Sequence, residues 1–180
     1  MFVLSMVKDK IMKIQDKLIT LYENKHIPSV NITYESGSPL QYKNDFLKIW
    51  LIHMEYLNSV GGSPLKNANS TIFNEALNKF MNKHKDVNLF IAKEGNGVVG
   101  VLQAGIAPNN QYGFISDLHV LEDYRNYGIG KNLLKNCMEW FNQNNVSEIG
   151  LEVAGGNKKA LSFYKKNGFN IDMYSLKIKL

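Results

Sequence analysis

A strand, a glycine-containing loop and an amphipathic helix follow one another over residues 114–141, and this order constrains the fold more than any other stretch. The apolar-rich segment 114–120 leads through a short turn into the loop Arg125–Lys131, R-N-Y-G-I-G-K. The first amides of a helix that begins in such a loop lack intrahelical partners, and the helix dipole favours an anion there. Gly128 and Gly130 have no Cβ to keep a bound pyrophosphate away from the backbone. The stretch therefore predicts a phosphate-binding loop.

Arg125 opens this loop and is the one arginine among the 21 Lys and Arg residues of the chain. Its planar guanidinium either matches the geometry of a phosphate or fixes the loop, and the sequence leaves both roles open. The net charge of +5 also favours an anionic ligand. Lysine and asparagine are abundant throughout the chain, however, so charge alone supports that interpretation only weakly.

The chain has 180 residues, 44% of them hydrophobic, which suits one well-buried core. We expect a single domain over residues 28–180 and an appendage over residues 1–27, an amphipathic helix with apolar residues at spacings of three and four. That helix either packs on its own domain, which we favour, or serves as the dimerisation helix of a homodimer. The single cysteine, Cys137, excludes an internal disulfide and is expected in the core. Short apolar runs and the lack of a cleavage site predict a cytoplasmic protein with no membrane partner.

Periodicity assigns the elements of the first half. Apolar residues at helical spacing predict helices over Tyr42–Leu57 and from Ser70, as N-cap, to about Lys85. Asn88–Glu94 and Val98–Ile106 are expected as strands, joined in a hairpin by Gly95-Asn96-Gly97, because glycine and asparagine tolerate positive φ. The first half is thus predicted to end in an antiparallel pair.

The second half continues with the helix after the loop, which we expect to end near Asn144. A strand over Val146–Val153, a short helix over Asn157–Lys166 stopped by Gly168, and a closing strand over Tyr174–Leu180 follow. A crossover through one helix makes the strand before the loop and the strand after it parallel neighbours. The predicted architecture is α/β (α+β), a mixed sheet with helices on both faces.

The motifs of the second half occur in a distinctive order. They are Asp117-Leu118-His119-Val120, the loop Arg125–Gly130, Leu151-Glu152-Val153, and then Asn157, Ala160, Phe163-Tyr164 and Gly168-Phe169. Four motifs in this order and spacing resemble the GNAT superfamily of acetyl-CoA-dependent N-acetyltransferases. The resemblance covers residues 88–180, whereas the first 87 residues match in their coarse layout of helices. It implies a GNAT-like acyl-CoA N-acyltransferase fold.

The resemblance also implies where acetyl-CoA, the co-substrate, would bind. In GNAT proteins the loop amides hold the pyrophosphate, the strand before the loop pairs through its backbone with the pantetheine arm, and an asparagine contacts the cofactor. The two parallel strands splay apart in such folds, so the thioester would lie between Val120 and Val153. The side chain of His119 is interpreted as packing or exposed, and no metal is expected. The implied cofactor-binding residues are Leu118, His119, Val120, Arg125, Asn126, Tyr127, Gly128, Ile129, Gly130, Lys131, Asn157, Ala160 and Phe163.

Acetyl transfer to an amine needs a base and an acid. An amine with a pKa of about 10.4 is mostly protonated at neutral pH and must lose a proton before it attacks. Asp117 is a candidate for this base. A water relay through Ser116 is the alternative, because several family members place a glutamate or histidine at the positions that Ser116 and Phe114 hold here. The resemblance implies that Tyr164 protonates the leaving thiolate.

We therefore expect an N-acetyltransferase that moves an acetyl group from acetyl-CoA to a primary amine of a small molecule or protein by direct attack. The alternative is an acyl-CoA-binding regulatory or assembly module on a GNAT fold, with little or no catalysis. Nucleic-acid binding ranks last, because the chain lacks an aromatic-basic stripe or a known motif for it. No motif in the sequence specifies the acceptor amine.

Overall fold

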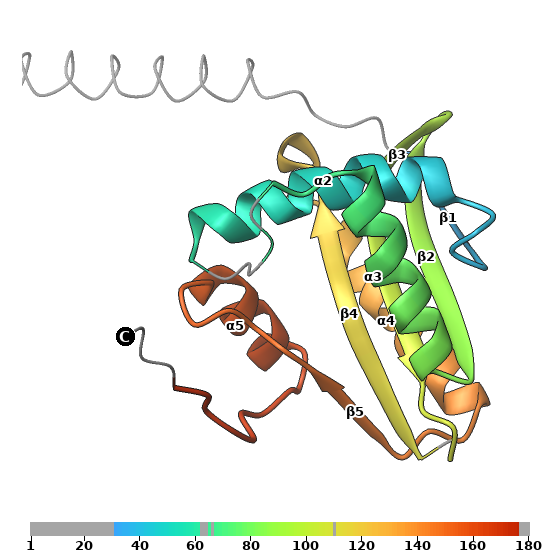
Figure 1. Cartoon of the computed structure of the whole chain (residues 1–180), viewed down its shortest axis with the longest axis vertical. Helices are drawn as coiled ribbons and strands as arrows, with labels where there is room; N and C mark the ends of the chain where they lie inside the picture. The colour runs from blue at the N-terminus through green and yellow to red at the C-terminus, as the bar shows by residue number, and fades with distance from the viewer. Residues whose placement is uncertain (1–30, 62–64, 66, 110, 177–180) are drawn as a thin grey trace, which may run out of the picture.

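A single five-stranded sheet organises the molecule (Figure 1). The computed structural model describes residues 31–61, 65, 67–109 and 111–176, so the helix predicted over residues 1–27 lies outside the described part. The strands are adjacent in chain order, antiparallel except for the last pair. They are β1 (Ile32–Gly37), β2 (Asp86–Glu94), β3 (Gly97–Ile106), β4 (Tyr112–Val120) and β5 (Glu148–Leu151). The parallel pairing of β4 with β5 confirms the predicted crossover.

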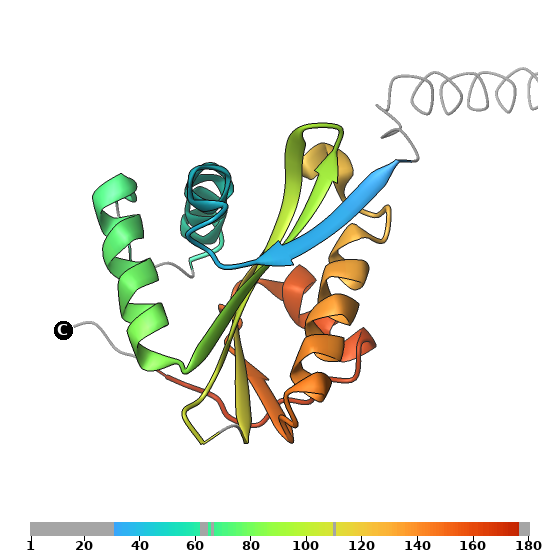
Figure 2. The same cartoon turned by 90° about the vertical axis from the view of Figure 1, so that its right-hand side faces the viewer.

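Helices cover both faces of the sheet, as predicted. Figure 2 shows α2 (Lys43–Ser59) and α3 (Ser70–Lys83) on one side, with α4 (Ile129–Gln143) and α5 (Lys158–Lys166) on the other. A short 3-10 turn, η1 (Glu122–Tyr124), links β4 to the loop before α4. The chain thus changes face once, through the strands β2, β3 and β4 that lie between α3 and α4.

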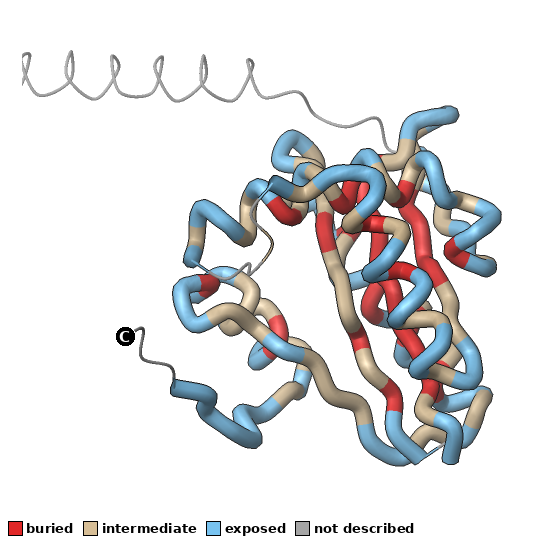
Figure 3. The backbone as a smooth tube through the Cα atoms, in the orientation of Figure 1, coloured by how far each residue is buried: buried red, intermediate tan, exposed pale blue. Residues whose placement is uncertain are grey.

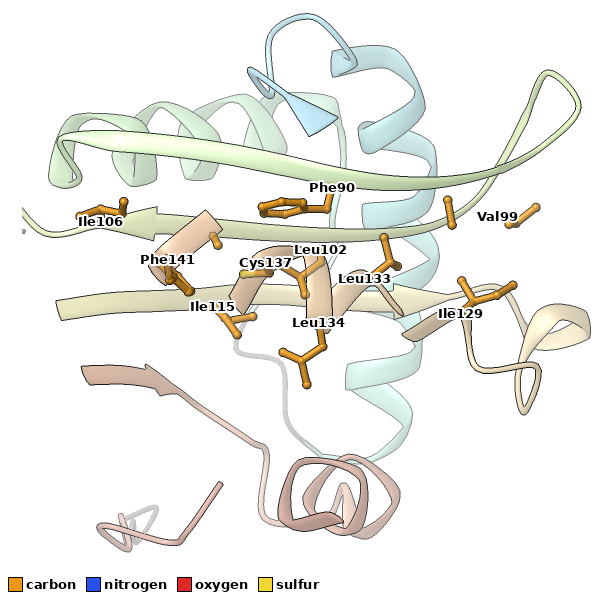
Figure 4. Close-up of a cluster of buried hydrophobic side chains, with 12 residues drawn as sticks. Phe90, Val99, Leu102, Ile106, Ile115, Ile129, Leu133, Leu134, Cys137 and Phe141 are labelled. Carbon is orange, nitrogen blue, oxygen red and sulfur yellow. The ribbon is translucent and has the colours of Figure 1, made fainter. Parts of the chain in front are cut away.

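Successive residues of the central strands supply two cores. Leu89, Ile91 and Val101 are buried beneath α2 and α3. Their neighbours Phe90 and Leu102 point to the opposite face, where they pack with α4 (Figure 4). Because side chains alternate along a strand, a strand that is covered on both sides buries successive residues and is mostly apolar. This explains the continuous apolar runs of β2 and β3, which form the buried centre of the molecule (Figure 3).

Local turn chemistry confirms most of the predicted boundaries and corrects one. The β2–β3 hairpin turns at Gly95, which has a φ of +55°, and α5 stops before Gly168, whose φ is +94°. The N-cap of α3, however, is Asn69 and not Ser70. The side-chain oxygen of Asn69 accepts hydrogen bonds from the backbone amides of Thr71 and Ile72, in the first turn of the helix.

The closing strand predicted over Tyr174–Leu180 is wrong for the described residues 174–176. These residues form no strand, and Tyr174 and Leu176 are exposed. Alternating apolar residues predict a strand only where a free sheet edge and a buried face are available to them. Residues 170–176 are exposed and pair with no strand in this structure, and residues 177–180 lie outside the described part.

Candidate functional site

β4 and β5 diverge beyond a short paired segment. Their pairing runs from Tyr112 opposite Glu148 to Ile115 opposite Leu151 and stops there. β4 continues to Val120, still paired with β3 on its other edge, while β5 ends (Figure 1). Among the described residues, the second half of β4 therefore has no strand partner on its β5 side. A backbone edge of this kind can pair with an extended ligand.

A β-bulge in β4 aims two neighbouring polar side chains at the same face. Gln103 pairs with Asp117 and Ala104 with Ile115, so Ser116 is the extra residue of the bulge. Ser116 Oγ lies 2.8 Å from Gln103 Oε1 and 2.8 Å from Asp117 Oδ2, and its one hydrogen serves either acceptor. The bulge thus brings both base candidates, Ser116 and Asp117, to the face covered by α2 and α3.

Two histidines from different elements adjoin Asp117. His53 of α2 and His119 of β4 approach through their Nδ1 atoms at 3.1 Å, and His53 Nε2 lies 3.9 Å from Asp117 Oδ1. Burial lowers the pKa of His53, although the charge of Asp117 opposes this shift. Burial and the neighbouring His53 lower the pKa of His119 to about 3. Both rings are therefore neutral at neutral pH. The side chain of His119 was predicted to be either packed or exposed, and the structure shows it packed.

The loop before α4 has the predicted backbone geometry. Gly128 is the N-cap, with a left-handed φ of +79° that favours glycine. The first intrahelical hydrogen bond of α4 runs from Asn132 N to Gly128 O, so the amides of residues 129–131 precede it. A Cβ on Gly130 would stand 3.7 Å from Val120, an ordinary contact, so packing against the protein does not require glycine there.

A chain of contacts joins this loop to α2 and α5. Arg125 Nε donates to Val120 O at 3.0 Å, and its guanidinium carbon lies 5.4 Å from the centre of the Tyr56 ring. Tyr56 OH in turn donates to Asn157 Oδ1 at 3.1 Å, and the same oxygen caps α5 by accepting from Ala160 N. Of the two roles open to Arg125, these contacts match the fixing of the loop.

Tyr164 of α5 is a buried phenol. Its ring packs edge-on against Phe163 and Phe169, with ring centres 5.2 and 5.5 Å away. Burial raises the pKa of Tyr164, and the charge of Asp117 raises it further, so the hydroxyl stays protonated.

Burial also raises the pKa of the Cys137 thiol, which is fully enclosed. The core position predicted for Cys137 is confirmed.

Residues 50–169, two thirds of the chain, match the model of the acetyltransferase (GNAT) family. The chain belongs to the GNAT family. It is similar to streptothricin acetyltransferase A of Bacillus subtilis, at 39% identity over 62 residues, which are 34% of this chain and 36% of that protein. It is also similar to an N-alpha-acetyltransferase of Sulfurisphaera tokodaii, at 32% identity over 102 residues, 48% of this chain and 59% of that protein. The matches thus span less than two thirds of either relative.

Solved structures share the GNAT fold at low identity. An aminoglycoside N-acetyltransferase in complex with CoA superposes with a TM-score of 0.64 and 12% identity, over 83% of this chain and 95% of that one. A Bacillus halodurans protein reaches a TM-score of 0.65 at 17% identity, over 82% of this chain and 99% of that one. The mixed sheet with helices on both faces is therefore confirmed as the GNAT architecture.

Within this GNAT fold, the predicted site residues gather around the diverging strands. The end of β4, the loop and the N-cap of α5 are joined through Arg125, Tyr56 and Asn157. Sequence reasoning missed His53, Tyr56 and Gln103. The one sequence feature that could have indicated His53 is its position as a histidine among the apolar residues of the predicted helix 42–57.

No helix in the described part is long and apolar enough to cross a membrane. The described residues also contain no group of three His, Cys, Asp or Glu side chains arranged to hold a metal.

Proposed function

We propose that this GNAT protein is a cytoplasmic N-acetyltransferase that moves an acetyl group from acetyl-CoA to a primary amine of a small molecule or protein. The observation that carries the proposal is the divergence of β4 from β5 between the start of α4 and the buried Tyr164. The named relatives add support, because both are acetyltransferases. One superposed acetyltransferase also holds CoA in its crystal structure.

The free amides at the start of α4 suit the pyrophosphate of acetyl-CoA. Asn126, Tyr127, Gly128, Ile129, Gly130 and Lys131 provide this anion site in the proposal, with Arg125 holding the loop in place. The backbone of Leu118, His119 and Val120 offers the unpaired edge of β4 to the pantetheine arm. Asn157, Ala160 and Phe163 line the side formed by α5.

The side chains can supply the two proton transfers. Asp117 takes a proton from the attacking ammonium group, either directly or through a water held by Ser116. The amine nitrogen then forms a bond to the thioester carbonyl carbon, and the carbon–sulfur bond breaks. Tyr164 gives its proton to the departing thiolate, the nitrogen loses its second proton to solvent, and solvent returns a proton to Tyr164. The free thiol and an acetamide are the products, and no covalent enzyme intermediate is needed.

A thiol-release assay with acetyl-CoA and a panel of amines tests this function, with mass spectrometry to detect the acetylated amine. Calorimetric titration of acetyl-CoA provides the separate measure of cofactor binding. Turnover above the uncatalysed rate supports the proposal. Tight acetyl-CoA binding without turnover across the panel would contradict it and support the acyl-CoA-binding regulatory module instead.

A further inference from the structure

A small cavity lies between α2, α3 and the face of β3 and β4. Its volume is about 160 Å³. At one end, Ala76 is exposed and Phe80 is half-buried, so this end reaches solvent. The walls are mostly aromatic and apolar and the floor is polar. The lining residues are Phe46, Trp50, Phe73, Ala76, Leu77, Phe80, Gln103, Ser116 and Asp117.

The floor carries a buried donor that has no partner. Gln103 is 3% exposed, and its Nε2 atom makes no hydrogen bond among the described residues. Its Oε1 atom lies 2.8 Å from the Ser116 hydroxyl, which donates either to it or to Asp117, and the Nε2 atom is left without a partner. An unsatisfied buried donor costs about 1–3 kcal/mol. A ligand that places an acceptor oxygen in this cavity would remove that cost.

The floor also carries a carboxylate without a permanent counter-ion. His53 is the one basic group within 4.0 Å of Asp117 in the described part of the chain. Burial lowers the pKa of His53, which disfavours a charged imidazolium beside Asp117 at neutral pH. A desolvated carboxylate of this kind favours an ammonium group. Aromatic walls favour a flat apolar body and attract a cation as well.

We propose that this cavity is the acceptor pocket and selects a compact primary amine that carries an aromatic ring and a hydroxyl group beside the amine. The ammonium group lies at Asp117, the hydroxyl oxygen accepts from Gln103 Nε2, and the ring lies among Phe46, Trp50, Phe73 and Phe80. The proposal rests on the proposed acetyltransferase function and specifies its acceptor.

Size and spacing support this class. A cavity of about 150 Å³ lined by apolar side chains accommodates a benzene ring. Gln103 and Asp117 both lie 2.8 Å from the same Ser116 hydroxyl, so their ligand partners must be close neighbours. An amine and a hydroxyl on adjacent carbons satisfy that spacing, as in 2-amino-1-phenylethanol. A large sugar with several ammonium groups fits neither the volume nor the single carboxylate.

A matched pair of ligands tests the floor of the pocket. Calorimetric titrations of 2-amino-1-phenylethanol and 2-phenylethylamine, each with and without CoA, measure binding independently of turnover. We expect the hydroxylated amine to bind about threefold to tenfold more tightly, the ratio that one net hydrogen bond produces. In Gln103→Leu the ratio should fall to about one. The same change should raise the stability of the protein or leave it unchanged, because it removes a buried unsatisfied donor.

A matched pair of variants tests the walls. Ala76→Leu adds a side chain at the open end of the cavity, whereas Asn78→Leu adds the same side chain at an exposed position of α3 outside it. We expect Ala76→Leu to weaken binding of both amines at least tenfold and Asn78→Leu to leave it within twofold. Circular dichroism and thermal melting confirm that both variants are folded.

Failure of this proposal is distinguishable from failure of the proposed function. Binding that Ala76→Leu abolishes, without thiol release, supports the pocket and contradicts the acetyltransferase. Acetylation of an aminoglycoside or a peptide amine at a rate that Ala76→Leu does not change supports the acetyltransferase and overturns the pocket. Equal binding of the two amines by the wild-type protein overturns the role of Gln103 Nε2.

Discussion

The Nδ1 atoms of His53 and His119 lie 3.1 Å apart, so one neutral imidazole donates to the other. His53 turns its second nitrogen toward Asp117 at 3.9 Å. The second nitrogen of His119, Nε2, is buried and has no hydrogen-bond partner among the described residues. A proton added to His119 Nε2 would therefore place a charge in a buried position without a hydrogen-bond acceptor. This makes the pair a site of acid sensitivity within the candidate active site.

Acid should destabilise the protein through His119. The folded-state pKa is about 3 against 6.5 for the free group, so below pH 6.5 the unfolded chain binds a proton that the folded chain does not. Stability from this group is complete above pH 6.5 and is lost as the pH falls toward 3, at about 1.4 kcal/mol per pH unit in between. Asp117, which faces His53, and Arg125 are the charged groups nearby.

Urea unfolding between pH 4 and 8 measures this slope. His119→Asn removes the titrating ring, and the difference in unfolding free energy between wild type and variant should shrink steadily below pH 6.5. The comparison uses the slope, so a constant loss of stability in the variant does not affect it. Parallel curves across the whole range would show that His119 is protonated in the folded protein as readily as in the unfolded chain.

Removing the Tyr164 hydroxyl should slow the chemical step. Tyr164→Phe keeps the ring between Phe163 and Phe169, so the fold should persist. Loss of a positioned general acid lowers the rate by about 100-fold or more. We expect that loss in kcat, with the KM for acetyl-CoA within about twofold. Tyr174→Phe, at a tyrosine that is 78% exposed outside the site, is the control. An unchanged kcat across the pH range would exclude Tyr164 as the acid.

A methyl group on Gly130 should block the cofactor without disturbing the fold. Its Cβ would make ordinary contacts with Val120 and Phe163, at 3.7 and 3.8 Å. Alanine also favours a helix over glycine by about 1 kcal/mol, so Gly130→Ala should melt at the same or a higher temperature. The methyl group would project where the anion must approach, and we expect at least tenfold weaker binding of CoA by calorimetry. Gly97→Ala in the β2–β3 hairpin is the control, and equal affinities in the two variants would place the pyrophosphate elsewhere.

The sequence predicted what local constraints determine. The loop and α4 depend on a left-handed Gly128 and an amphipathic run, both visible in the sequence. The contact between His53 and His119 joins residues 66 positions apart, and no local pattern indicates it. Strict alternation along β4 would also separate Ser116 from Asp117. The bulge that unites them arises from the register against β3, which sequence periodicity does not reveal.

Asn157 combines a structural role with a predicted cofactor contact, and two substitutions separate them. Its Oδ1 atom caps α5 at Ala160 N and accepts from Tyr56 OH, so Asn157→Ala should cost about 1–2 kcal/mol of stability. Asn157→Asp keeps an oxygen that accepts both bonds and places a negative charge at the start of α5, where the helix dipole favours it. Its stability should stay close to that of the wild type.

The aspartate variant lacks the amide donor, however, and it repels phosphate. If the Asn157 amide contacts acetyl-CoA, Asn157→Asp should bind CoA at least tenfold more weakly at unchanged stability, as read by calorimetry and thermal melting on the same preparation. Wild-type affinity in Asn157→Asp, together with lost stability in Asn157→Ala, would restrict this residue to joining α5 with Tyr56. In that case the cofactor side of the site would depend on the α4 loop and the free edge of β4 alone.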